Sequence, residues 1–152
     1  GMEACGGAQY WARELTKLGH EVRLIAPQYV KPWVQTNKSD AADARAICRA
    51  VQEPGMRFVG IATEAQQDVQ ALHRVRSRVL RNRTALVNQL HGLLLEYGVA
   101  VPQGRAALRK ALATFLAEER GTPLLRQLLT EQQAELADWD HRLEAITTCI
   151  DR

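Results

Sequence analysis

The sequence predicts an α/β domain followed by a mainly helical region, with helix predominating overall. Residues 8–26 contain a helical pattern, a glycine and a short apolar run in succession, which is typical of an α/β layer. From residue 63 onward, apolar residues recur in alternating steps of about four and three, the spacing of paired amphipathic helices. We therefore expect a first domain over residues 1–62 and a helical-hairpin or coiled-coil region over residues 63–152.

The α/β part is expected to begin with a helix over residues 8–18, which Gly19 ends. Residues 22–26 form an apolar run closed by a proline and predict a strand, and residues 57–61 are expected to supply another. Because two short strands make only a marginal sheet, we expect this part of the fold to be incomplete. Trp11 lies on the apolar stripe of its helix and is expected in the core.

Two long helices are expected in the second region. In the first of them the d-like heptad positions are all apolar, whereas Arg76 and Arg83 interrupt the a-like positions. Residues 98–104 contain glycine and proline and break the pattern, and a short helix is expected over residues 106–119.

The second long helix is expected to begin where Thr122 supplies an N-cap and a proline follows it. Trp139 lies on its apolar stripe and is expected in the core. Two such helices can fold back on each other as an antiparallel hairpin. Their seams are also candidates for binding a second copy of the chain.

Asp40 and Asp43 are an informative acidic pair. The segment after residue 38 is rich in alanine and free of glycine and proline, so it predicts a helix. Because each helical residue advances about 100°, both carboxylates share a face with Ile47 and Val51, which we expect to pack inward. Carboxylates at this spacing lie about 5–6 Å apart at Cβ and could hold Mg²⁺. Alternatively, Asp40 is the N-cap of the helix and Asp43 stabilises the helix dipole.

The composition is that of an ordinary folded protein. Hydrophobic residues make up 46% of the chain, and the net charge of +3 permits nucleic-acid binding without requiring it. The 3 cysteines are widely separated, which disfavours a zinc site or a disulfide framework and fits a reducing cytoplasm. Cys48 is expected on the buried side of its helix as a packing residue. No apolar run is long enough to span a membrane, so no membrane partner is expected.

Three segments together resemble a known family. In sequence letters they are MEACGG from Met2, PQYVKP from Pro27 and KSDAADA from Lys38, the first followed by Tyr10-Trp11. In this order and spacing they resemble the DEDD transposases of bacterial insertion sequence family one-hundred-ten. The resemblance runs through nearly the whole chain, and it implies a RuvC-like catalytic domain, DNA as a partner and a bacterial cytoplasmic location.

The resemblance also implies the site residues. Asp40 and Asp43 match the family's paired aspartates, and Glu3 matches a glutamate that precedes small residues. In RuvC-like nucleases such acids bind divalent ions, here Mg²⁺ or Mn²⁺, which activate the nucleophile and stabilise the leaving oxygen during phosphodiester cleavage. Glu3, Asp40 and Asp43 are therefore the expected catalytic and metal-binding residues.

The same resemblance implies a piece of a longer protein, truncated at both ends. The family's first aspartate lies on a strand upstream of the glutamate, and a C-terminal domain carries a serine implicated in strand exchange. Residues 1–62 would then be the C-terminal part of the RuvC-like domain. We expect the chain alone to bind metal poorly and to be inactive.

A cluster of arginines occupies the first long helix: Arg74, Arg76, Arg78, Arg81 and Arg83. Such a cluster can bind nucleic-acid phosphates. Alternatively, the guanidinium groups are only solvated, and the aliphatic parts of the arginine side chains cover the apolar contact between two helices. The resemblance favours nucleic acid, with Lys38 as a further contact. In the family a structured guide RNA directs the choice of DNA, so RNA is a second expected partner.

The sequence thus predicts a metal-dependent DNA transposase fragment that binds nucleic acid through its arginine helix and forms a homo-oligomer through its heptad seams. The alternative is a catalytically inactive product that acts as a dimerising or nucleic-acid-binding helical module. A helical interaction protein without a nucleic-acid role is the third interpretation.

Overall fold

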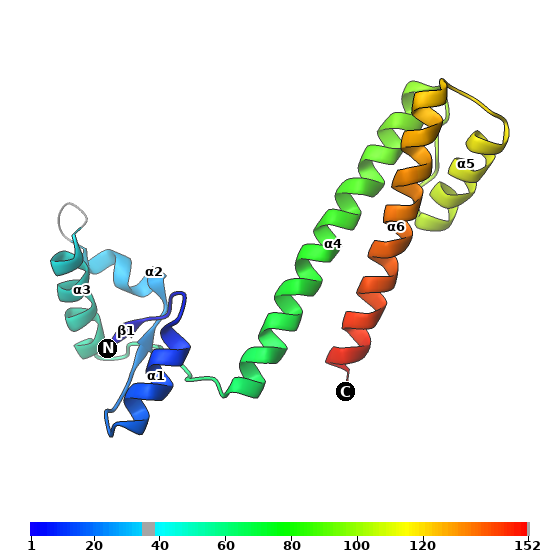
Figure 1. Cartoon of the computed structure of the whole chain (residues 1–152). Coiled ribbons are helices and arrows are strands. Elements are labelled where there is room, and N and C mark those ends of the chain that lie inside the picture. The colour runs from blue at the N-terminus through cyan, green and yellow to red at the C-terminus, as the bar shows by residue number, and fades with distance from the viewer. Residues whose placement is uncertain (35–38, 152) are drawn as a thin grey trace. The chain divides into compact units, whose positions relative to one another are not determined.

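The structure is a computed structural model that describes residues 1–34 and 39–151 (Figure 1). The chain divides into two compact units, which we call unit 1 (Gly1–Gln67) and unit 2 (Asp68–Arg152). Unit 1 contains a small sheet with helices, whereas unit 2 is helical, so the predicted predominance of helix is confirmed. Among the described helices, none combines the length and the apolar character needed to cross a membrane.

Unit 1 is built around a three-stranded sheet, whose strands are β1 (Met2–Glu3), β2 (Leu24–Ile25) and β3 (Phe58–Val59). β1 pairs parallel with β2, and β3 pairs antiparallel with β2, so β2 is the central strand. The two strands expected from the apolar runs are both present in shortened form, and β1 is an addition to them.

The helices of unit 1 are α1 (Ala8–Lys17), α2 (Pro27–Val30), the 3-10 helix η1 (Lys31–Trp33) and α3 (Asp40–Gln52). Successive residues of a strand point to opposite faces of a sheet. Leu24 of β2 accordingly packs with α1, and Ile25 packs with α2 and α3. Helices therefore cover both faces of the central strand.

α1 packs on the sheet through alanines rather than through its aromatic residues. Ala8 and Ala12 are buried against Leu24. Trp11 is 58% exposed, so the prediction that it lies in the core is wrong. The reason is that the small alanine side chains form the face toward the sheet, which turns the aromatic stripe outward.

α3 also packs through an alanine line. Ala42, Ala46 and Ala50 are buried, and Ile47 and Val51 of the face predicted to point inward are half-buried and pack against the core around Ala46 and Ala50. Cys48 and Asp40 are both exposed, so their predicted burial is wrong. Both residues lie on the side of the helix away from the alanine line.

Unit 2 contains most of α4 (Glu64–Glu96), together with α5 (Arg105–Ala117) and α6 (Pro123–Ile150). α4 and α6 lie side by side as an antiparallel hairpin, with α5 beside them near the turn (Figure 1). The expected hairpin and short helix are present. The hydroxyl of Thr122 accepts a hydrogen bond from the backbone N–H of Leu125 at 3.2 Å, as the predicted N-cap requires.

The core of unit 2 draws leucines from all three helices, together with Phe115 of α5; the buried members are Leu86, Leu90, Leu94, Leu108, Leu112, Phe115, Leu125, Leu129 and Leu136. The half-buried Trp139 packs against this core. Near the end of α4 Leu94 is buried, and Leu93 is half-buried and packs against the same core. The part of the α4 seam nearest the turn is thus used within the chain, whereas Val69 near the start of α4 is 45% exposed.

Candidate functional site

Two of the expected acidic residues line one hollow in unit 1. Glu3 ends β1, and Asp43 lies in the first turn of α3. They line a hollow of about 260 Å³ together with Lys31 and the apolar residues Pro27, Val30 and Val34. The fold therefore brings together two acids that lie on different elements.

Backbone contacts fix where these two acids lie. Glu3 pairs in register with Ile25, and the N–H of Ala4 donates to the carbonyl of Ile25 at 2.8 Å. At the start of α3 the hydroxyl of Ser39 accepts a hydrogen bond from a first-turn backbone N–H at 3.3 Å. Ser39 is therefore the N-cap, which leaves Asp43 in the first turn, where the helix dipole favours a carboxylate.

Asp40 and Lys38 are placed differently. Asp40 is the exposed first residue of α3, outside the set that lines the hollow, and the interpretation of Asp40 as the N-cap is wrong. Lys38 lies outside the described residues. In residues 1–34 and 39–151, no three side chains of the His, Cys, Asp and Glu types lie together as a metal site.

The chemistry of the hollow suits a hard cation. Carboxylate oxygens are preferred ligands of Mg²⁺, which binds through one or two of them and keeps several waters. Glu3 and Asp43 are both half-buried, so the charge of a cation bound between them would be less screened by solvent than at an open surface. Lys31 also lines the hollow, and its positive charge offsets part of the negative charge of the two acids.

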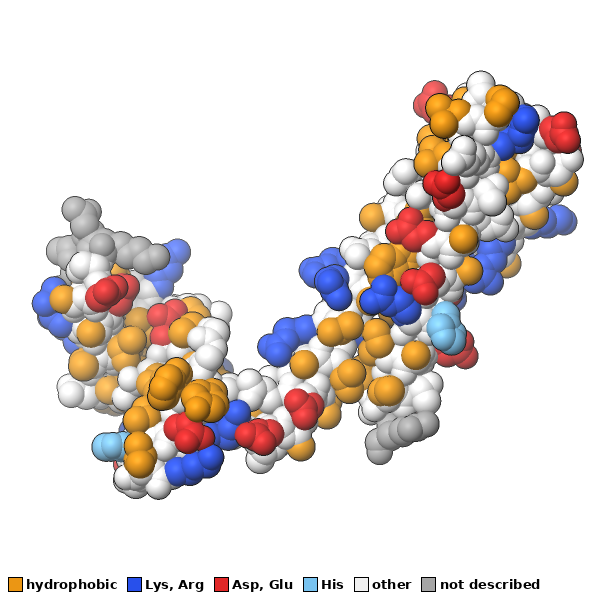
Figure 2. Space-filling view, viewed as in Figure 1, with side chains coloured by type: hydrophobic (Ala, Val, Ile, Leu, Met, Phe, Trp, Pro, Cys, Tyr) orange, Lys and Arg blue, Asp and Glu red, His pale blue; other side chains and the backbone are white. Residues whose placement is uncertain are grey.

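The arginines of α4 fall into two groups. Arg74, Arg78 and Arg81 are exposed, and at this spacing they form a stripe along one face of the helix. We call them the arginine stripe; Lys and Arg side chains gather along the α4 side of unit 2 (Figure 2). Arg76 and Arg83 are half-buried and lie at the contact with α6.

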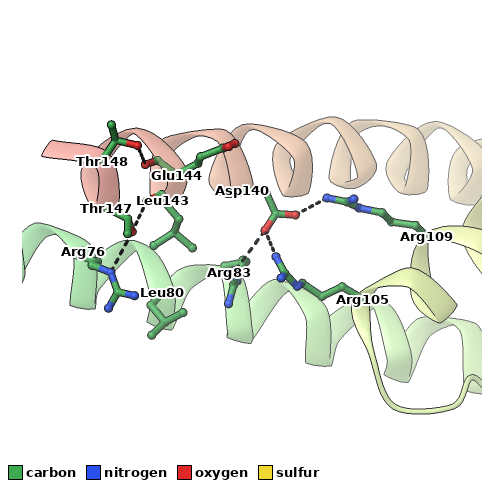
Figure 3. A pocket seen from close by; sticks show the side chains of 10 residues that line it. All are labelled: Arg76, Leu80, Arg83, Arg105, Arg109, Asp140, Leu143, Glu144, Thr147 and Thr148. Atoms are coloured by element: carbon green, nitrogen blue, oxygen red, sulfur yellow. Dashed lines mark hydrogen bonds and ion pairs between the residues drawn. The ribbon is translucent and has the colours of Figure 1, made fainter. Parts of the chain in front are cut away.

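Sequence reasoning missed a polar cluster around Asp140 (Figure 3). The guanidinium of Arg83 donates to this carboxylate at 3.2 Å, and Arg105 of α5 donates to it at 2.7 Å. Arg109 of α5 also donates to the Asp140 carboxylate. The Asp140 side chain is only 14% exposed, so three cations surround one partly buried anion.

The arginines change the acidity of Asp140. Burial raises the pKa of this carboxyl, but the hydrogen bonds from Arg105, Arg83 and Arg109 outweigh burial and hold the pKa below its ordinary value. The carboxylate is therefore ionised over the whole neutral range, and the ion pairs persist there.

The same residues line a pocket of about 510 Å³, which we call the arginine pocket. Its lining comprises Arg76, Leu80, Arg83, Arg105, Arg109, Asp140, Leu143, Glu144, Thr147 and Thr148. The Nε of Arg76 donates to the Thr147 hydroxyl at 3.3 Å.

One sequence signal for this cluster exists, since a charge at a seam position such as Arg83 requires an acid on the facing helix. The contribution of α5 has no such signal, because it depends on how that helix docks.

The fold and its two sites define a protein with an acidic hollow in an α/β unit and an arginine-rich surface on a helical unit. The chain belongs to the DEDD family of transposases of IS110-type insertion sequences. The family profile, described as "Transposase", matches residues 1–99. The resemblance drawn from the sequence motifs is confirmed.

Several bacterial relatives are similar to this chain. It is 53% identical over 146 residues to a "Probable family 20 transposase" of Pseudomonas aeruginosa, covering 93% of this chain and 43% of the relative. It is 48% identical to the "Transposase for insertion sequence element IS1328" of Yersinia enterocolitica, covering 85% of this chain and 38% of the relative. It is 43% identical to the "Transposase for insertion sequence element IS1111A" of Coxiella burnetii, covering 93% and 40%. The chain therefore spans less than half the length of these relatives, and no solved structure matches it.

Proposed function

We propose that the chain is the part of a DNA transposase that contributes acidic metal ligands and a nucleic-acid-binding helical hairpin. The observation that supports this best is that Glu3 and Asp43 line the same hollow. Family membership independently predicts these two acids as site residues. On this proposal unit 1 is part of a RuvC-like catalytic domain.

The residues of the hollow fit a divalent cation such as Mg²⁺ or Mn²⁺. Glu3 and Asp43 would bind the ion through carboxylate oxygens, whereas Asp40, one turn before Asp43, is exposed and does not line the hollow. When bound, such an ion activates the attacking oxygen and stabilises the leaving oxygen in phosphodiester cleavage. Lys31 would hold a phosphate of the DNA strand beside the two acids through its ammonium group.

Unit 2 would bind the nucleic acid backbone. Arg74, Arg78 and Arg81 are exposed along one face of α4, where they can contact successive phosphates. DNA is the partner that the family implies, and a structured guide RNA is a second partner with the same backbone chemistry. A homo-oligomer would use the start of the α4 heptad run, where Val69 is 45% exposed, because Leu86, Leu90 and Leu94 further along α4 are buried within unit 2.

The catalytically inactive module is the second candidate function. It is favoured by one observation: within the described residues, the acids do not form a three-ligand group. In this case the chain would bind nucleic acid through α4 without any dependence on metal.

A metal titration separates the two. We expect Mn²⁺ binding to the purified chain, measured by calorimetry, to weaken about tenfold or more in Glu3→Gln and in Asp43→Asn. Asp40→Asn should have a smaller effect because Asp40 is exposed and does not line the hollow. The matched control is Glu53→Gln, an exposed acid at the other end of α3. Binding that is equally strong in all four variants would reject a metal site in this hollow, and binding that is absent would leave the binding module as the function of this chain.

A further inference from the structure

We propose that the arginine pocket of unit 2 binds a phosphate group of a nucleic-acid backbone, and that Asp140 holds the arginines in place for it. This inference deepens the proposed nucleic-acid role of unit 2 and rests on it. It assigns a second contact point, separate from the arginine stripe.

The first argument is the charge of the pocket. Arg83, Arg105 and Arg109 all pair with the Asp140 carboxylate. In the part of the chain that the structure describes, no other acid lies within ion-pair distance of these three groups. With Arg76 and Glu144 included, the lining carries four arginines against two acids. The pocket therefore has an excess of positive charge, which a bound anion would offset.

The second argument is the number of free donors. A guanidinium has five N–H donors and a carboxylate has about four lone-pair sites, so three arginines cannot direct all of their N–H groups to one carboxylate. The side chains of Arg105 and Arg109 are 55% exposed, which leaves their remaining N–H groups accessible. Arg76 bonds only the Thr147 hydroxyl among the described residues. Guanidinium groups bind phosphate through paired N–H donors, which suits this arrangement.

The third argument concerns how the fold positions the arginines. Arg76 and Arg83 come from α4, Arg105 and Arg109 from α5, and Asp140 from α6, so packing of three helices builds the pocket (Figure 3). Asp140 contacts three of the arginines at once and limits the directions in which they point. The arginine stripe lies on the opposite face of α4 from Arg76 and Arg83, so the two contact points can be mutated separately.

The test measures binding of a short labelled single-stranded RNA, and of the DNA of the same sequence, to the whole chain by fluorescence anisotropy across a salt series. We expect the double variant R105A/R109A to weaken binding about tenfold or more. The slope of log affinity against log salt should decrease by about one. The matched control R120A/R142A removes the same charge elsewhere in unit 2 and should bind like the wild type in slope and affinity.

Asp140→Asn gives the opposite prediction, because it removes a competing negative charge and keeps an oxygen acceptor for the arginines. Affinity should rise several-fold in this variant. If R105A/R109A does not fold, as judged by circular dichroism, R105K/R109K carries the test, since it keeps the charge but loses the paired donors and should weaken binding.

The outcomes separate this inference from the proposed function. Equal loss in R105A/R109A and its control, or no gain in Asp140→Asn, overturns the pocket. If only R74A/R78A/R81A loses binding, the nucleic-acid role stands and the pocket assignment fails. Inorganic phosphate is also added at the concentration of phosphate groups that the oligonucleotide supplies. If it displaces the oligonucleotide from the pocket, the site binds free phosphate, and the assignment to a nucleic-acid backbone is overturned.

Discussion

The guanidinium of Arg83 on α4 lies 3.2 Å from the carboxylate of Asp140 on α6, although the two residues are 57 positions apart in the sequence. Arg76 lies about two turns before Arg83 on α4, and it donates a hydrogen bond to Thr147, which lies about two turns after Asp140 on α6. These two contacts run in opposite directions along the helices and define the antiparallel register. Arginines at seam positions are therefore compatible with pairing of the helices within one chain.

Removing Asp140 should destabilise the hairpin. We expect Asp140→Ala to lower the free energy of unfolding by about 2–3 kcal/mol, because it leaves the half-buried Arg83 without its anion. The control is Asp138→Ala, whose side chain is 62% exposed and lies 3.9 Å from Arg142. It should change the stability by less than about 1 kcal/mol. Urea denaturation followed by circular dichroism measures both, and equal effects would show that the Asp140 cluster does not stabilise the hairpin.

The stability of the hairpin should depend on acid pH through the same carboxyl. The pKa of Asp140 is lowered in the folded chain relative to the unfolded one. The stabilisation is therefore complete above the unfolded-state pKa, about 3.9, and is lost as the pH falls through the lower folded-state pKa. The difference in free energy of unfolding between wild type and Asp140→Asn should shrink as the pH is lowered from about 5 to about 2. A difference that stays constant over this range would contradict the prediction.

Leucine substitutions should distinguish the two seam arginines. Arg76→Leu adds apolar surface beside Leu80 and Leu143 and removes only a bond to a hydroxyl, so we expect a gain of about 1 kcal/mol in stability. Arg83→Leu removes one of the donors to the partly buried Asp140 and should not stabilise the hairpin. Thermal unfolding of both variants measures this, and stabilisation by both would mean that the Arg83 pair contributes nothing.

Packing of the alanine face of α3 should determine how well the acidic hollow binds Mn²⁺. Ala46 is fully buried and packs with Ile25 and Val30, so Ala46→Leu has no room and should destabilise unit 1 by about 1–3 kcal/mol. Because Asp43 lies on the same helix, Mn²⁺ binding should weaken as well. Ala44→Leu is the matched control, since Ala44 is exposed and the same change there should leave both properties unaltered. Full Mn²⁺ affinity in folded Ala46→Leu would show that the hollow does not depend on this packing.

The sequence predicts the elements of this chain well because capping residues and long heptad patterns are local. Thr122 and the break at residues 98–104 mark helix ends, and both lie where expected. The faces of the short helices are less predictable. In α1 and α3 the buried residues are alanines, and a pattern weighted by large apolar side chains such as Trp11 selects a different face.

The candidate site is predictable only in part for a related reason. The motif resemblance predicts Glu3 and Asp43 as site residues, and the structure brings these two to one hollow. Asp40 has the same motif support but lies on the exposed side of α3. The cluster around Asp140 depends on how three helices dock, and no short-range pattern encodes that arrangement.

The most direct test of the metal site is a double-mutant cycle on Glu3 and Asp43. Mn²⁺ affinity is measured for wild type, Glu3→Gln, Asp43→Asn and the double variant by calorimetry under identical salt and pH. If the two carboxylates bind one ion, the double variant should lose less affinity than the product of the two single losses, because one substitution already disables the shared site. Independent, multiplicative losses, or no loss at all, would contradict a shared metal site in this hollow.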